Sequence, residues 1–170
     1  MSGSSVEAKP SAPAPHIILL RRFQPGDEVA FRTLNEQWIA IYFTLEDKDR
    51  VTLNDPAGKI LSHGGHIFMA ERDGSCIGTC ALLAIELGAY EVGKMAVEEQ
   101  SNGLGVGRLI LERAISEAKK LSAHRLYLET NSQLLNAGHH YESIGFQHRP
   151  PERVTPSPYA RSNVLMEMLL

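Results

Sequence analysis

Cysteine is scarce in this sequence, which holds two in 170 residues. Cys76 and Cys80 lie in one strand-like segment, too few and too close together for a disulfide framework, so we expect small buried side chains in a reducing cytoplasm. Long apolar runs are also absent: CALLAI is among the longest, so no transmembrane helix and no membrane partner are expected. No basic stretch stands out, and the formal net charge of -3 argues against nucleic acid as the main partner.

The first fifteen residues, MSGSSVEAKPSAPAP, are rich in Ser, Ala and Pro and lack the apolar run of a signal peptide. We interpret residues 1–15 as a flexible N-terminal tail. Residues 16–170 have the length of one domain, and the contents of 43% hydrophobic and 22% charged residues are typical of a globular protein. The expected organisation is therefore a tail followed by a single domain.

Strand-like and helix-like segments alternate along this domain. The order that we predict is β-α-(α)-β-β-β-α-β-α-β, a mixed α/β fold without internal repeats. The strongest local signal is Asp73-Gly74 between two β-rich runs, which is typical of a hairpin. The other expected elements are a strand over 16–23, a helix that begins near Asp27, an irregular helical stretch before residue 60, a strand over 89–97, a helix with an apolar stripe from Ile110 to Leu121, a strand over 124–130, a helix over 133–144 and a strand over 163–169.

Three glycines, Gly103, Gly105 and Gly107, occupy alternate positions of NGLGVGRLIL, where the apolar helix begins. Each glycine in a helix costs about 1 kcal/mol relative to alanine, so three together need a reason. Backbone N–H groups between a strand and a helix bind anions, and side chains would keep a phosphate away from them. Arg108 does not fit the Lys-Ser/Thr end of a Walker A loop, nor the last glycine of the dinucleotide fingerprint. The sequence of this loop alone is compatible both with a phosphate loop of another kind and with a turn that binds no ligand.

The segments around this loop narrow the choice. The run EVGKMAVEEQSNGLGVGRLILERAI, followed by LYLETNSQLLNAGHHYESIGF, resembles the GNAT family of acyl-CoA-dependent N-acetyltransferases from roughly Gly65 to the C-terminus. The resemblance implies the GNAT acyltransferase fold, in which helices flank a mostly antiparallel sheet whose central strands splay. It also implies acetyl-CoA as the acyl donor, with the pantetheine arm paired to the backbone of Met95, Ala96 and Val97.

The loop matches the family pattern Gln/Arg-x-x-Gly-x-Gly/Ala in two registers. Gln100 with Gly103 and Gly105 matches by letter, whereas the spacing between strand and helix places Asn102 at the Gln/Arg position. We prefer the second register, because geometry sets that spacing. Asn102 then departs from the family pattern, although the backbone still offers its donors. The expected coenzyme-binding residues of the loop are Asn102, Gly103, Leu104, Gly105, Val106, Gly107 and Arg108.

Direct transfer to an amine needs a base for the amine, donors for the tetrahedral oxyanion and an acid for the departing thiolate. Glu91 lies six residues before Val97, where some relatives carry a base glutamate, and it would act directly or through water. A solvated edge carboxylate is the structural alternative for Glu91, and Glu86 is the second candidate base. The oxyanion would be held by a backbone N–H near Met95.

Tyr141 matches the tyrosine of the family pattern A-x-x-L-Y-x-x-x-G-F, with Ala137, Gly145 and Phe146 in register. Its phenol is expected to protonate the leaving sulfur, unless Tyr141 is only part of an apolar core stripe. His140 stands where relatives carry Leu, and Leu134 stands where many carry Asn. Asn131 is a candidate replacement for that contact with the coenzyme, or a helix cap.

The remaining polar groups carry weaker signals. The histidines of HGGH and of the His139-His140 pair have no ligand spacing with Cys or acidic residues, so no metal is expected. The acidic run Glu46, Asp47 and Asp49 is interpreted as a solvated face rather than a site for a cationic amine. The expected acceptor is a primary amine of a small molecule. Acetylation of a peptide or protein, and a CoA-binding regulatory domain without turnover, are the alternatives, and a homodimer is a further possibility.

Overall fold

The computed structural model describes residues 17–170, so the tail expected over residues 1–15 lies outside the described residues. Seven strands form one sheet in the order β1-β2-β3-β4-β5-β7-β6. The strands are β1 (Leu19–Arg22), β2 (His66–Arg72), β3 (Ser75–Glu86), β4 (Ala89–Val97), β5 (Arg125–Thr130), β6 (Gln147–His148) and β7 (Val164–Leu169). The helices are α1 (Glu28–Tyr42), α2 (Asp47–Asn54), α3 (Pro56–Lys59), α4 (Val106–Lys120) and α5 (Leu135–Ile144), with short 3-10 turns η1 (Leu61–His63), η2 (Glu99–Ser101) and η3 (Pro151–Arg153).

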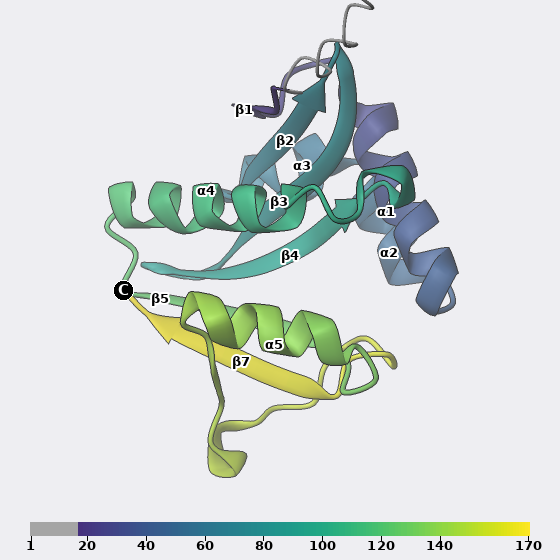
Figure 1. Cartoon of the computed structure of the whole chain (residues 1–170). Helices are drawn as coiled ribbons and strands as arrows, with labels where there is room; N and C mark the ends of the chain where they lie inside the picture. Colours follow the sequence, from purple (N-terminus) through teal and green to yellow (C-terminus); the bar gives the residue numbers. More distant parts are fainter. Residues whose placement is uncertain (1–16) are drawn as a thin grey trace, which may run out of the picture.

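Helices cover both faces of the sheet (Figure 1). The strand β2 shows the alternation that this requires: Phe68 and Ala70 enter the core beneath α4, whereas Ile67 and Met69 enter the core beneath α1. The stripe of α4 supplies Ile110, Leu111, Ala114, Ile115 and Ala118 to the first core, as its 3.6-residue period predicts. The mixed α/β fold with a mostly antiparallel sheet is confirmed.

The hairpin between β2 and β3 turns at the predicted dipeptide. Asp73 and Gly74 have φ values of 51° and 79°, and two successive positive φ angles are what a two-residue type I′ turn requires. Cys76 and Cys80 both lie in β3 and are free thiols.

The centre of the sheet is irregular. The strands β4 and β5 run parallel, and they pair only over Ala89–Glu91 and Arg125–Tyr127. Beyond these residues both strands continue without a ladder between them, and Figure 1 shows β4 and β7 diverging toward the end of the molecule where α1 and α2 lie. Splayed strands leave backbone N–H and C=O groups of β4 without a partner strand, so this gap is suited to an extended ligand.

Two details of the fold were not predicted from the sequence. Asp27 occupies the N-cap position of α1, but its side chain makes no cap bond, because it accepts hydrogen bonds from Arg21 and from the backbone N–H of Gln24. The two-residue strand β6 was not expected, since two residues carry no periodicity. Among residues 17–170, no helix has the length and apolar character to cross a bilayer.

Candidate active site

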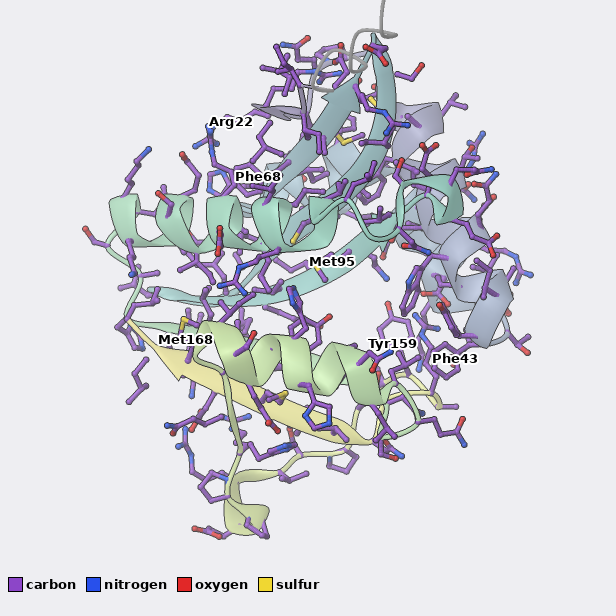
Figure 2. The ribbon with its side chains drawn as sticks, viewed as in Figure 1. Arg22, Phe43, Phe68, Met95, Tyr159 and Met168 are labelled. Carbon is purple, nitrogen blue, oxygen red and sulfur yellow. The ribbon has the colours of Figure 1, made fainter. Side chains whose placement is uncertain are left out.

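A cavity of about 300 Å³ opens where β4 and β5 part. It gathers seven of the residues expected to act in catalysis or coenzyme binding: Glu91, Met95, Ala96, Val97, Asn102, Asn131 and Tyr141. The end of α1 and the segment after η3 close its far side, where Figure 2 shows Phe43 and Tyr159 at the same end of the molecule. Glu86 does not line the cavity; it is exposed and its carboxylate bonds Arg125 at 2.8 Å.

The strand β4 carries a bulge inside this cavity. The residues Thr79 and Ala81 of β3 pair with Ala96 and Gly93, so two steps along β3 match three steps along β4. Lys94 sits in the extra step with a φ of 48°, a left-handed conformation that is uncommon for residues other than glycine. A bulge frees backbone N–H groups from the ladder, and Met95 follows it directly, with its side chain in the gap toward α5 (Figure 2).

Glu91 is half-buried on β4, and its carboxylate accepts a hydrogen bond of 3.4 Å from the hydroxyl of Tyr127. The pKa of Glu91 is raised to about 7, first by burial and then by the nearby charge of Glu129, against the opposing effects of Lys94 and the Tyr127 hydroxyl. A carboxylate with a pKa near neutrality can take a proton from an ammonium group and release it again at physiological pH.

Tyr141 projects from α5 into the other wall of the cavity and packs against Phe146, with ring centroids 6.1 Å apart. Burial raises the pKa of its phenol above the ordinary value, and Cys80 adds to the effect. A raised pKa keeps the hydroxyl protonated, so the group can act as a proton donor and not as a base.

The glycine loop lies between η2 and α4 and supplies donors rather than side chains. Gly103 and Gly105 have φ values of 83° and 74°, so both positions favour glycine, and Gly105 is the N-cap of α4. The first bond within the helix runs from the N–H of Leu109 to the carbonyl of Gly105 at 3.1 Å. The N–H groups of residues 106–108 therefore have no acceptor inside the helix and point out of its positive end. Gly107 is helical, and a Cβ there would meet only Val97 at 3.9 Å.

The two asparagines occupy different environments. Asn102 is exposed at the mouth of the cavity. Asn131 uses both ends of its amide within the protein: its Nδ2 donates to the carbonyl of Arg161 at 2.6 Å, and its Oδ1 accepts from the N–H of Gln133 at 2.8 Å. The side chain of Asn131 thus ties β5 to the segment before β7, and a coenzyme contact would compete with these bonds.

An ion-pair cluster that sequence reasoning missed frames the far side of the cavity. Asp49 of α2 is fully buried; it accepts two hydrogen bonds from Arg161 at 2.8 and 2.6 Å and pairs with Lys94 at 3.4 Å. The Tyr159 ring lies against both cations, 4.8 Å from the Lys94 ammonium and 4.6 Å from the Arg161 guanidinium. Despite the desolvation of its buried carboxylate, the pKa of Asp49 is lowered, because Arg161 and Lys94 stabilise the charge. The interpretation of this acidic run as a solvated face is therefore wrong for Asp49, although Asp47 is exposed.

No local signal marks this cluster, because Lys94 is 45 residues and Arg161 is 112 residues from Asp49 in the chain. Only the packing of α2 against the open end of the sheet brings them together. Within residues 17–170, no group of three or more His, Cys, Asp or Glu side chains is placed to hold a metal ion.

The Acetyltransferase (GNAT) family model matches residues 29–146. The mycothiol acetyltransferase of Sanguibacter keddieii is 26% identical over 157 residues, which cover 85% of this chain and 48% of that protein, so the chain spans about half the length of this relative.

Two solved structures illustrate the likeness in fold. A GNAT-family acetyltransferase from Staphylococcus aureus Mu50 has a TM-score of 0.81 at 17% identity, over 90% of this chain and 99% of that chain. The protein yncA from Salmonella typhimurium, solved with its cofactor acetyl-CoA, has a TM-score of 0.69 at 17% identity, over 90% and 94% of the two chains. Identities this low show the fold alone.

Proposed function

The chain belongs to the acetyltransferase (GNAT) family, and on that premise we propose that it transfers the acetyl group of acetyl-CoA directly to a primary amine of a small molecule. The observation that carries the proposal is one cavity between the splayed strands β4 and β5, which is lined by both Glu91 of β4 and Tyr141 of α5. A base and an acid in one cavity suit a reaction that takes a proton from one partner and gives a proton to the other.

The donor site is assigned to the loop and to β4. The N–H groups of residues 106–108 and the positive end of α4 would hold the pyrophosphate of the coenzyme, since glycine leaves the backbone accessible there. Over Met95–Val97, the edge of β4 that faces β5 has no partner strand and would pair with the pantetheine arm. Acetyl-CoA supplies the activated acetyl group as a cosubstrate, and the proposal needs no metal.

The proposed acid–base roles follow from the two environments. Glu91 removes a proton from the ammonium form of the acceptor, because its pKa of about 7 leaves the carboxylate available at neutral pH. The oxyanion then lies near the N–H groups freed by the bulge at Lys94 and Met95. Tyr141 is protonated at neutral pH, as any phenol is, and burial raises its pKa further; its hydroxyl donates the proton to the departing sulfur.

A small acceptor is favoured over a peptide by the shape of the cavity. Its volume of about 300 Å³ is at the small end of the range for small-molecule sites. The two hydrogen bonds from Arg161 to Asp49 also hold the segment before β7 against α2, and Arg161 lines the cavity. The name of the Sanguibacter keddieii relative also points to a small-molecule substrate for that protein. A cytoplasmic location and a homodimer stay predictions.

The test is a panel of small amines and short peptides incubated with acetyl-CoA, in which released thiol and acetylated product are both measured. The proposal expects equal amounts of free CoA and acetylated small amine. Product from peptides alone would move the function to peptide acetylation. Tight binding of acetyl-CoA without any product would indicate a regulatory domain.

A further inference from the structure

Glu129 is a cavity carboxylate that the proposed reaction does not use. It is half-buried on β5 and lines the same cavity as Glu91. Glu91 pairs with Tyr127 across the two strands, and Glu129 lies two residues further along β5, on the same face as Tyr127. The backbone positions of Glu91 and Glu129 are therefore offset along the strand direction by roughly 6–7 Å, at about 3.3 Å per residue.

The carboxylate of Glu129 has acceptor positions that no hydrogen bond among the described residues occupies. Its Oε2 accepts a hydrogen bond of 2.5 Å from the hydroxyl of Ser157. A carboxylate offers about four acceptor positions, so most of its capacity is unused by that bond. Among the described residues, no salt bridge reaches Glu129, whereas Glu167, the other half-buried carboxylate on β5 and β7, is paired with Arg153 at 2.8 Å.

The cations in the cavity do not neutralise this charge. Lys94 and Arg161 are its two basic lining residues. Asp49 bonds both of them, and Glu46 adds a second carboxylate to Arg161 at 3.2 Å. Two cations are thus balanced by two carboxylates within the cluster, and Glu91 and Glu129 leave the acceptor side of the cavity negative when both are ionised.

We propose that the acceptor is a compound with two positively charged groups and no carboxylate, in which one amine faces Glu91 for acetylation while the second cationic group pairs with Glu129. This inference rests on the proposed function, since it names the substrate class of that site. A second ammonium meets a half-buried carboxylate that no salt bridge among the described residues reaches, and a charge-assisted bond of this kind is about twice as strong as a neutral one. An acceptor with a carboxylate at that position would place two negative groups together and would be rejected.

Three compounds with the same four-carbon chain isolate the effect of the far group: putrescine, with a second ammonium, butylamine, with a methyl group, and γ-aminobutyrate, with a carboxylate. Their affinities for the CoA-loaded protein are measured by calorimetry at pH 8, and their kcat/KM values with acetyl-CoA. The proposal expects the affinity and the kcat/KM of putrescine to be about tenfold or more above those of butylamine, and those of butylamine to be above those of γ-aminobutyrate. Added salt should weaken the binding of putrescine more than the binding of butylamine.

Glu129→Gln keeps the shape of the side chain and removes the charge. In this variant the ratio of the affinity for putrescine to the affinity for butylamine should fall toward one, and the affinity for γ-aminobutyrate should rise. Glu152→Gln removes one charge from an exposed residue outside the cavity, so the wild-type ratio should persist there. Retained binding of CoA by each variant shows that it is folded.

Two results would overturn the proposal: equal affinity of the wild-type protein for putrescine and butylamine, or a putrescine preference that survives Glu129→Gln. Both are read from binding of the amine, so they are distinct from a failure of the proposed function, which would appear as absent binding of acetyl-CoA or absent release of thiol.

Discussion

At the scale of single residues, the role proposed for Glu91 requires a charge that destabilises the folded protein. Its carboxyl group is half-buried next to Glu129, so the ionised form that a base requires is the form that the fold disfavours. Tyr141 is in the opposite situation, because burial favours the neutral phenol that an acid requires. Their strand and helix were predictable from periodicity, whereas the roles proposed for them come from the resemblance to the family. The pKa environments were not predictable, because Tyr127 and Glu129 are far from Glu91 in the chain.

Glu91→Gln removes the base and keeps the size of the side chain. The wild-type kcat/KM is expected to rise with pH through about 7, where Glu91 ionises, and the variant should lack that rise. Near neutral pH the loss should be about 100-fold, with the affinity for acetyl-CoA nearly unchanged. Equal pH–rate profiles for the two proteins would remove Glu91 from the mechanism.

The same variant is expected to be more stable than the wild type in alkaline solution. The folded pKa of Glu91 is above its unfolded value, so the folded protein binds more protons in the window between the ordinary value of 4.5 and about 7. The stability from this group therefore falls as pH rises through that window. At pH 8 the substitution should raise the free energy of unfolding by about 1–3 kcal/mol, given about 1.4 kcal/mol per pKa unit. At pH 4, where the wild-type carboxyl is mostly protonated in both states, the gain should nearly vanish. Urea unfolding at both pH values measures this, and a destabilised variant at pH 8 would contradict the burial argument.

Tyr141→Phe removes one hydroxyl and keeps the ring that packs against Phe146. If the phenol protonates the leaving sulfur, the single-turnover rate should fall by about 100-fold while acetyl-CoA still binds. Single-turnover measurement is needed because product release can limit steady-state turnover. An unchanged single-turnover rate would return Tyr141 to a packing role.

At the scale of elements, the glycine loop shows what a pattern can and cannot reveal. Three alternate glycines predicted a special backbone at the start of α4. The structure distinguishes them: Gly103 and Gly105 have positive φ, and Gly107 is helical. The letters alone could not separate these cases, because φ depends on how the chain turns from η2 into the helix.

A matched pair of substitutions tests this difference. Gly105→Ala forces a Cβ into the left-handed region and should destabilise the protein by about 1–2 kcal/mol, although no atom lies within 4 Å of that Cβ. Gly107→Ala has helical φ and only an ordinary contact with Val97, so it should stabilise the protein by about 0.5–1 kcal/mol. Thermal unfolding of both variants provides the comparison, and equal effects would contradict the assigned backbone conformations.

The ion-pair cluster is the clearest limit of sequence reasoning at this scale. The hairpin at Asp73-Gly74 and the stripe of α4 follow from local patterns, and both were predicted. The bonds from Asp49 to Lys94 and Arg161 form only when α2, β4 and the segment before β7 have already packed. Long-range polar contacts between such segments leave no periodic trace in the chain.

At the scale of the whole molecule, the sheet consists of two parts that meet along a short parallel ladder. The strands β1 to β4 and the strands β5 to β7 are joined by only three pairs of residues, between β4 and β5 (Figure 1). A ligand that fills the gap would bridge both parts, so acetyl-CoA should stabilise the entire fold and not only the loop.

Calorimetric titration of acetyl-CoA, with thermal unfolding of the same samples, tests the central claim most directly. We predict a dissociation constant in the micromolar range. At a hundredfold excess over that constant the gain is about 2.7 kcal/mol, which raises Tm by roughly 5–10 °C. Gly105→Glu places bulk and negative charge beside the phosphates and should abolish both effects in a folded protein. Absence of heat and of any Tm shift with millimolar acetyl-CoA or CoA would contradict the account.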